Sequence, residues 1–287
     1  VSGQLQQKEL DGCVFAGELA LDGSLRPIKA TINIVQKAKQ AGYETIYIPL
    51  ANAEQASLIS GITIFGVSSI KQLFLHLKKE SLIEPYCEKN NLEPKKIISS
   101  PILDDIKGQD QAKRALVIAA AGHHNLLMSG TPGAGKTMLA KSLINLLPNL
   151  SPDEQLDVTK IHSLAGKVDG EIIDIRPFRS PHHTSSLISI VGGGNQPKPG
   201  EVSLAHTGVL FLDEMPEYPR QILEALRQPL EDKKIDISRA NGRVSYPADF
   251  MLVATMNPCP CGYYGDQTKE CTCTNNQITA YQKKLSG

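Results

Sequence analysis

An eight-residue glycine-rich stretch constrains the fold of this chain more than any other feature of its sequence. Residues 130–137 read Gly-Thr-Pro-Gly-Ala-Gly-Lys-Thr and complete the pattern G-x-x-x-x-G-K-[ST]. An apolar segment typical of a buried strand, Asn125 to Ser129, precedes the stretch, and a segment with helical spacing, Lys136 to Leu147, follows it. A strand, a glycine loop and a helix in that order point backbone N–H groups at phosphate oxygens. The sequence therefore predicts a phosphate-binding loop within an α/β fold.

The chemistry of such a loop assigns roles to two of its side chains. The lysine contacts the β and γ phosphates of a nucleoside triphosphate, and the hydroxyl that follows it holds Mg²⁺. We assign these roles to Lys136 and Thr137, and we expect ATP and Mg²⁺ as cofactors. The residues predicted to contact the nucleotide are Gly130, Thr131, Pro132, Gly133, Ala134, Gly135, Lys136, Thr137 and Met138.

Two later apolar segments end in side chains that suit the same chemistry. The apolar run from Val209 to Leu212 predicts a strand buried on both faces, and Asp213 and Glu214 follow it directly. Asp213 suits coordination of Mg²⁺, and Glu214 suits polarisation of an attacking water. Asn257 ends a third apolar segment, where its amide can lie beside the γ-phosphate. We therefore predict that Lys136, Glu214 and Asn257 are the catalytic residues.

Length and patterning predict two domains. A chain of 287 residues is long enough for about two. Residues 1–85 alternate strand-like and helix-like segments, which indicates an α/β layer. Residues 86–102 have neither period and are interpreted as a linker, and residues 103–287 form the second α/β unit, which contains the phosphate-binding loop.

Composition argues against several classes of partner. Thirty basic residues balance thirty acidic ones, so contact with nucleic acid must come from a local patch. The longest aliphatic run, Ala115 to Ala121, is far shorter than the ~20 residues that span a bilayer, so no membrane partner is expected. The chain runs from Val1 to Gly287 without a secretory leader. We interpret it as a piece of a longer protein and expect a cytoplasmic location.

Four of the six cysteines lie within fifteen residues and form two C-x-C pairs, Cys259 with Cys261 and Cys271 with Cys273. Four thiolates can close a tetrahedral structural Zn²⁺ site, although one-residue spacing is less typical than a spacing of two to four. Reduced thiols without a metal and disulfides are the alternatives. The histidines at 182, 183 and 206 also invite a metal interpretation. We expect instead that they are polar loop residues or pore-facing contacts to phosphate, because the rings of adjacent histidines should point to different sides.

A predicted hairpin carries the best candidate patch for nucleic acid. Two β-prone runs, Ile235 to Ala240 and Arg243 to Tyr246, flank Asn241-Gly242, a dipeptide that favours a tight hairpin turn. Cations aimed at phosphates are sufficient for contact with a nucleic-acid backbone. The alternative is a solvated face on which nearby carboxylates offset the cations. The candidate cations are Lys233, Lys234, Arg239 and Arg243.

The order of these motifs resembles that of the AAA+ ATPase core, and specifically the magnesium-chelatase-like ComM/YifB group. The stretches that carry this resemblance are Arg176–Thr184, Val191–Gly194, Pro199–His206, Val209–Pro216, Ile237–Gly242 and Ala254–Gly262. By resemblance, residues 130–137 are the Walker A motif, Asp213 and Glu214 the Walker B acids, and Asn257 the sensor 1 residue. The fold class that the resemblance implies is a P-loop AAA+ core, with a parallel sheet and flanking helices, that lacks its C-terminal lid.

The resemblance also implies what the longer protein does. The group forms hexameric rings in which a neighbouring subunit supplies an arginine finger, and its members act on DNA as branch-migration motors. The finger follows a Ser-Gly-Pro stretch, and this sequence stops at Ser286-Gly287. No finger is therefore assigned, and this chain should bind ATP better than it hydrolyses it.

Residues 1–85 resemble part of a Lon-protease-like domain, most clearly at Gly17 to Pro27. Ile32 stands where the protease lysine would be, so proteolysis is not expected. Two other functions stay open. One is a magnesium-chelatase motor subunit that drives insertion of Mg²⁺ into a tetrapyrrole, and the other is a nucleotide-gated scaffold.

Overall fold

The computed structural model describes residues 10–87, 102–168, 171–194, 197–239 and 242–285. Its contacts divide the chain into two compact units. The first unit consists of Val1–Lys95 and Ser151–Asp174, and the second consists of Lys96–Leu150 and Ile175–Gly287.

The first unit contains a three-stranded parallel sheet in the order β1-β4-β5. Its apolar core lies between this sheet and α1, where Ile32 and Val35 meet Ile46 and Ile64. The alternating pattern predicted for residues 1–85 is therefore confirmed as an α/β layer. The elements of this stretch are β1 (Cys13–Phe15), β2 (Glu18–Leu19), β3 (Leu25–Arg26), α1 (Thr31–Gln40), β4 (Thr45–Pro49), η2 (Leu50–Asn52), α2 (Ala53–Ser57), β5 (Thr63–Val67) and α3 (Ile70–Leu77).

A helix from the middle of the chain, α6 (Pro152–Leu164), packs with the first unit. Leu156 lies against the apolar core of that unit, and the Ser163 hydroxyl accepts a hydrogen bond of 3.0 Å from the Ala30 backbone. The predicted division placed all of residues 103–287 in one unit. The difference arises because these contacts join residues more than a hundred positions apart, which no local pattern in the sequence records.

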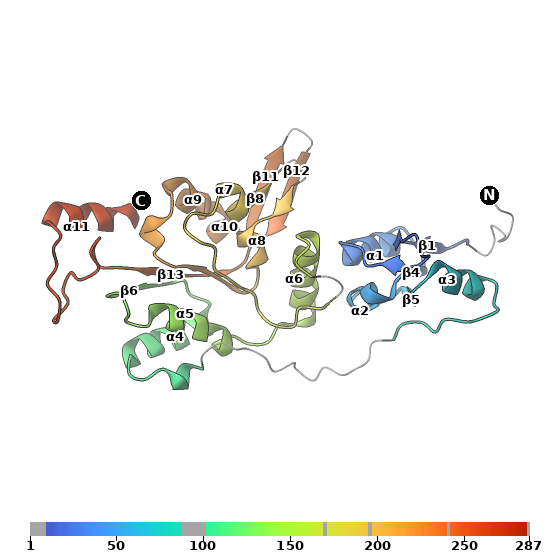
Figure 1. The fold of residues 1–287 in the computed structure, drawn as a ribbon, viewed down its shortest axis with the longest axis horizontal. Helices are drawn as coiled ribbons and strands as arrows, with labels where there is room; N and C mark the ends of the chain where they lie inside the picture. The colour runs from blue at the N-terminus through green and yellow to red at the C-terminus, as the bar shows by residue number, and fades with distance from the viewer. Residues whose placement is uncertain (1–9, 88–101, 169–170, 195–196, 240–241, 286–287) are drawn as a thin grey trace. The chain divides into compact units, whose positions relative to one another are not determined.

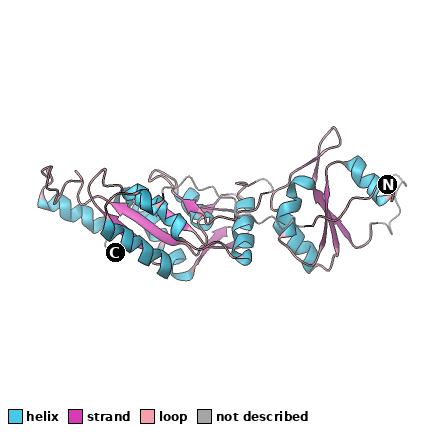
Figure 2. Cartoon of the chain, turned by 90° about the horizontal axis from the view of Figure 1, so that it is seen from below, coloured by secondary structure: helices cyan, strands magenta, loops and turns pink. Residues whose placement is uncertain are grey.

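The second unit is built on a four-stranded parallel sheet in the order β6-β13-β10-β7. All described positions of β10 and β13 are buried, as expected for central strands of a parallel sheet. Helices α4 and α5 cover one face, and α7, α9 and α10 lie on the other (Figure 1). Figure 2 shows the helices and strands of the chain from below, coloured by type. The elements on the sheet are α4 (Asp110–Gly122), β6 (Leu126–Ser129), α5 (Lys136–Ser142), β7 (Phe178–Arg179), α7 (Leu187–Val191), β10 (Val209–Leu212), α9 (Arg220–Ala225), α10 (Arg227–Asp232) and β13 (Met251–Met256).

The predicted hairpin forms and projects from the second unit (Figure 1). Strand β11 (Lys234–Arg239) pairs antiparallel with β12 (Gly242–Pro247), so Gly242 begins a strand, and Asn241 lies outside the described residues. The remaining elements of the unit are η3 (Leu103–Asp105), η4 (Leu143–Leu146), β8 (Gly192–Gly193), β9 (Lys198–Pro199), α8 (Glu201–Leu204), η5 (Met215–Glu217), α11 (Asn275–Gln282) and η6 (Lys283–Leu285).

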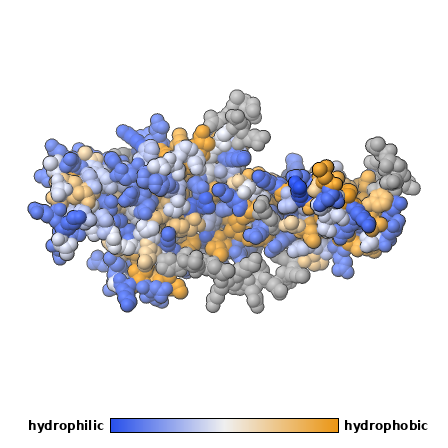
Figure 3. Space-filling view, in the orientation of Figure 1, coloured by the Kyte–Doolittle hydropathy of each residue, from blue (hydrophilic) through white to orange (hydrophobic). Residues whose placement is uncertain are grey.

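Among the described residues, no helix has both the length and the apolar character needed to cross a membrane. Hydrophobic side chains do lie on the surface of α4 (Figure 3), where Val117 is 48% and Ile118 54% exposed. With 13 residues, α4 is too short to span a bilayer.

Candidate active site

The glycine-rich stretch forms the predicted loop between β6 and α5. Gly133 and Gly135 have φ angles of 79° and 81°, a left-handed conformation that glycine adopts at low cost. Gly135 directly precedes the first residue of α5, and the Gly130 N–H donates to the Met256 carbonyl at 3.3 Å. The loop is therefore tied to β13 at its start and to α5 at its end.

The Lys136 ammonium group lies inside this loop. It donates to the carbonyl oxygens of Gly130 and Thr131 at 2.6 and 3.0 Å and to Oδ1 of Asn257 at 3.2 Å. Burial lowers the pKa of Lys136, and the charges of Asp213 and Glu214 act in the opposite direction. Two residues predicted to be catalytic, Lys136 and Asn257, are thus in direct contact although they lie 121 positions apart.

The two predicted Mg²⁺ ligands also meet. The Thr137 hydroxyl donates to Oδ2 of Asp213 at 3.2 Å. Asp213 follows β10, and Thr137 is the second residue of α5, which follows β6, so the contact connects segments that follow different strands of the sheet. A hydroxyl and a carboxylate oxygen side by side are the hard oxygen ligands that Mg²⁺ prefers, and the residues present therefore fit this ion.

Glu214 lies in a strained backbone conformation beside a cleft. Its φ and ψ angles are 52° and 50°, which few residues other than glycine adopt. The cleft has a volume of about 720 Å³ and brings together residues from the segment after β10, from α11 and from the stretch between β13 and α11, residues 257–274, which carries the four clustered cysteines and is called the cysteine loop here. Its lining residues are His183, Glu214, Glu217, Asn257, Pro260, Gln277, Ala280, Tyr281 and Lys284.

Sequence reasoning did not identify the role of Tyr218 or His183. The Tyr218 hydroxyl donates to the Pro181 carbonyl at 2.6 Å, and the His183 ring meets the Tyr218 ring edge-on with centroids 6.4 Å apart. Burial raises the pKa of Tyr218 to about 12, and the charge of Asp213 acts in the same direction. The Tyr218 hydroxyl therefore stays protonated and can donate its hydrogen bond to the Pro181 carbonyl.

The expectation that the rings of His182 and His183 point apart was wrong, because their centroids lie 4.1 Å from each other.

The four clustered cysteines converge. Their Sγ atoms all lie within 4.8 Å of one another, and none of the six cysteines forms a disulfide. Hydrogen bonds lower the pKa of Cys261 to about 5, and the one donated by the Tyr263 N–H has the largest effect. For Cys271, the hydrogen bond from the Cys273 N–H lowers the pKa, but desolvation and the thiols of Cys261 and Cys259 outweigh it and raise that pKa to about 12.

The spacing of the four sulfur atoms suits a bound metal ion. Four thiolates at this separation repel one another unless a cation lies between them. Four sulfur ligands around Zn²⁺ lie about 3.8 Å apart, so the cluster fits this ion.

The cysteine loop lies against the phosphate-binding loop. A Cβ atom added to Gly262 would lie 2.8 Å from the ring carbons Cγ and Cδ of Pro132 and 4.0 Å from Cγ of Asn257. Gly262 also has a φ of 86°, so glycine is required there both for backbone conformation and for space. The cysteine loop therefore forms one wall of the candidate site.

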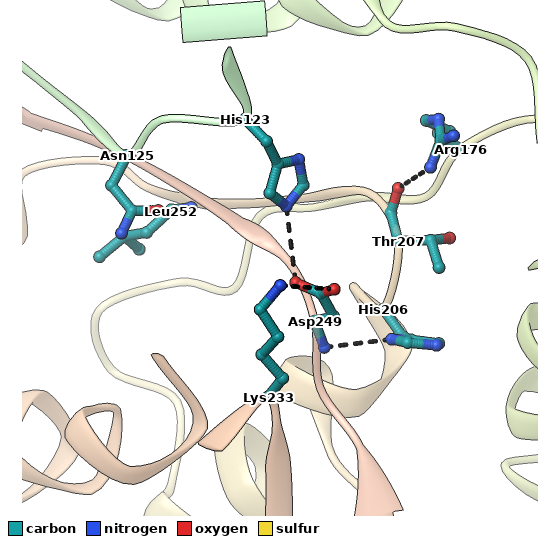
Figure 4. Close-up of polar contacts among 8 residues, drawn as sticks. All are labelled: His123, Asn125, Arg176, His206, Thr207, Lys233, Asp249 and Leu252. Carbon is teal, nitrogen blue, oxygen red and sulfur yellow. Dashed lines mark hydrogen bonds and ion pairs between the residues drawn. The ribbon is translucent and has the colours of Figure 1, made fainter. Parts of the chain in front are cut away.

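The candidate cations for nucleic acid are partly neutralised. Lys233 and His123 lie 3.1 and 3.6 Å from the two carboxylate oxygens of Asp249 (Figure 4). Arg243 pairs with Asp236 at 2.7 Å, and this hydrogen bond is the main reason that the pKa of Asp236 is lowered. Lys234 is exposed, and the side chain of Arg239 lies outside the described residues.

Comparison with protein families shows to which family this chain belongs. Residues 102–287 match the family described as magnesium chelatase, subunit ChlI, and residues 1–52 match one described as subunit ChlI of Mg-chelatase. The chain belongs to the magnesium chelatase subunit ChlI family. The resemblance to magnesium-chelatase-like proteins inferred from the motifs is thus confirmed.

Individual relatives place the chain within the family. It is 43% identical over its whole length to the competence protein ComM of Haemophilus influenzae, of which it covers 56%. It is 27% identical to the magnesium-chelatase 67 kDa subunit of Chlorobaculum tepidum over 54% of this chain and 23% of that protein. A structure of the complex between subunits BchI and BchD of magnesium chelatase contains a 22% identical chain with a TM-score of 0.45, and the match covers 64% of this chain and 67% of that one.

The chain therefore spans about half the length of the curated relative ComM. The mixed α/β fold with parallel sheets agrees with the AAA+ class expected for this family. The family implies ATP and Mg²⁺. The residues that would hold the nucleotide are those of the glycine-rich loop and of the cleft beside Glu214. The residues that would hold Mg²⁺ are Thr137 and Asp213. The roles of the individual residues stay predictions, as does the likeness of residues 1–85 to a Lon-protease-like domain.

We predict that Gly262→Ala weakens binding of Mg-ATP by about tenfold, because the added methyl group pushes on Pro132 of the phosphate-binding loop. Gly265→Ala is the matched control. Gly265 has a similar φ of 79°, but a Cβ there meets no atom within 4 Å. Titration of each variant with a fluorescent ATP analogue measures the effect, and equal affinities for the two variants would contradict it.

Proposed function

We propose that this chain is the ATP-hydrolysing core of a ring-forming AAA+ motor that acts on DNA as a branch-migration helicase. The observation that carries the ATPase assignment is the convergence of Lys136, Thr137, Asp213 and Asn257 at the carboxyl edge of one parallel sheet. Ligands of open α/β sheets bind outside this edge.

The proposed hydrolysis follows from the contacts of the site. The carbonyl and amide oxygens that now accept from Lys136 are replaced by phosphate oxygens, and the Asn257 amide is released to face the γ-phosphate. Glu214 accepts a proton from the water that attacks the γ-phosphorus, and the bond to the β-phosphate oxygen breaks. Thr137 and Asp213 would hold Mg²⁺, which when bound would neutralise the negative charge that develops on the phosphates.

The ring assembly rests on the family resemblance. A neighbouring subunit would supply an arginine finger. We propose that this arginine enters the cleft, where Glu214 and Glu217 provide carboxylates that attract it. Lys284 lies 3.8 Å from Glu217, so one of these carboxylates is partly compensated already.

We expect Lys136→Ala to lose about thirtyfold or more in ATP affinity, because removing one partner of a desolvated charge pair costs about 2–5 kcal/mol. Glu214→Gln should bind ATP normally and fail to turn it over. Lys141→Ala, an exposed lysine on the same helix α5, is the control and should resemble the wild type. Calorimetric titration and phosphate release measure both effects, and normal turnover by Glu214→Gln would refute the assigned base.

We also propose that the cysteine cluster holds one structural Zn²⁺. The support is the convergence of four Sγ atoms and the free state of all four thiols. All four ligand positions would be filled by protein, so the ion would hold the loop together and take no part in hydrolysis.

Metal analysis of the purified chain should find about one zinc per chain. Cys261→Ser should lose it, since serine oxygen is a poor substitute for a thiolate ligand. Cys87→Ser removes an exposed cysteine outside the cluster and should keep the metal. Absence of zinc from both the wild type and Cys87→Ser protein would rule out the site.

The DNA assignment rests on the hairpin and on the resemblance to the ComM/YifB group. The Arg243 side chain is 69% exposed, whereas that of its partner Asp236 is only 13% exposed. A guanidinium has five N–H donors, so we propose that Arg243 contacts a phosphate while it stays paired with Asp236. In a ring each hairpin would be repeated, so a chain of zero net charge could still form a basic channel.

Reversing the charge of Arg239 and Arg243 to glutamate should weaken DNA binding and reduce its dependence on salt concentration, because fewer phosphate contacts form. Arg114→Glu is the control, since Arg114 is exposed on α4 on the opposite face of the sheet (Figure 1). Fluorescence anisotropy at several salt concentrations gives both quantities. Unchanged affinity of the double variant would place DNA contact elsewhere.

The principal alternative is a magnesium-chelatase motor subunit, which the description of the matched family favours. Higher identity to ComM over the whole chain favours the DNA motor. ATPase assays of the full-length protein separate the functions. Stimulation by DNA supports the motor, stimulation by chelatase partner subunits supports the alternative, and no turnover supports a nucleotide-gated scaffold.

A further inference from the structure

We propose that Thr255 is a positioning residue that holds the two acids after β10 in the geometry needed for hydrolysis. This inference rests on the proposed ATPase function. Thr255 lies on β13, two residues before Asn257, and is completely buried. Nothing in the motifs distinguishes it from the apolar residues around it.

The register of the sheet brings Thr255 beside the acids. Strands β10 and β13 run parallel, and their last pair is Leu212 opposite Ala254. Asp213 directly follows Leu212, and Thr255 directly follows Ala254. The chain direction and the pairing therefore place one hydroxyl next to one carboxylate at the edge of the sheet.

The hydroxyl group of Thr255 uses both of its hydrogen-bonding functions on the acids. It donates to Oδ1 of Asp213, and it accepts from the backbone N–H of Glu214 at 2.9 Å. A threonine hydroxyl has a single proton to donate, so the donor is fully committed to Asp213. One buried side chain thus contacts the proposed metal ligand and the proposed base at the same time.

The contact with Asp213 orients its carboxylate. One carboxylate oxygen accepts from Thr255, and the other accepts from the Thr137 hydroxyl at 3.2 Å. Turning the carboxylate plane partway would break both hydrogen bonds. Thr255 therefore fixes the plane of the Asp213 carboxylate, and with it the direction in which the second oxygen faces the metal-binding side.

The contact with Glu214 holds a strained backbone. Glu214 has a φ of 52° and lies beyond Leu212, the last residue of β10 that pairs with β13, so regular strand pairing no longer supplies an acceptor for its N–H. The Thr255 hydroxyl satisfies that N–H and so stabilises the conformation in which Glu214 lines the cleft with Asn257.

The test compares Thr255→Val with Thr255→Ser in the full-length protein. Valine keeps the shape of threonine and removes the hydroxyl, whereas serine keeps the hydroxyl and removes a methyl group. We expect Thr255→Val to lower kcat for ATP about tenfold to a hundredfold and to raise the Mg²⁺ concentration at half-maximal rate about tenfold. KM for ATP should change less than about threefold, because the phosphate-binding loop itself is untouched. Thr255→Ser should retain all three constants within about threefold.

Two outcomes would overturn the inference. The first is that Thr255→Val keeps the wild-type kcat and the wild-type Mg²⁺ dependence. The second is that Thr255→Ser is impaired as strongly as Thr255→Val, which would indicate that Thr255 acts through packing. Thermal unfolding of each variant shows whether it is folded, and Thr255→Cys, whose thiol is a weak donor, replaces valine if that variant does not fold.

Failure of the proposed function has a different signature. If the wild type turns over no ATP, the ATPase assignment fails, and binding of an ATP analogue across a Mg²⁺ titration then decides the inference. A tenfold loss of the Mg²⁺-dependent affinity in Thr255→Val with rescue by serine supports it. Equal Mg²⁺ dependence in all three proteins refutes it.

Discussion

Burial of β13 between β6 and β10 is the constraint on which the candidate site depends. The carboxyl ends of parallel strands meet at one edge, and this strand order puts three different chain segments there. The glycine loop follows β6, Asp213 follows β10, and Asn257 follows β13. Each of these residues would be an ordinary polar side chain at a strand end if the central strand were displaced.

The polar groups at that edge are held by one another before any ligand arrives. The Lys136 ammonium contacts two loop carbonyls and Asn257, and Asp213 is held from one side by Thr137 and from the other by Thr255. Such preorganisation lowers the cost of ordering the site when charge is bound. The cysteine loop adds a further restraint, because Gly262 lies directly against Pro132.

The elements with strong local signals could be predicted from sequence alone. The loop at 130–137, the strand before the two acids and the paired strands β11 and β12 of the hairpin all appear where their patterns indicated them, because glycine placement and apolar runs act locally. The membership of α6 in the first unit could not be predicted, since it depends on contacts such as that between Ser163 and Ala30. The ion pairs of Lys233 and Arg243 were likewise invisible, because their partners are selected by strand pairing and packing.

Sequence by itself determined the residue types of the candidate site and the order in which they occur, since a glycine loop, an acid pair and an asparagine follow apolar strands in a pattern that predicts phosphate chemistry. Tertiary structure decided which of them touch. It placed Thr255 beside Asp213, turned Glu214 into a left-handed conformation and brought four cysteine sulfurs within 4.8 Å. The physical reason is that hydrogen bonding, register and close packing act between residues that are distant in the chain, and residue identity alone does not specify those distances.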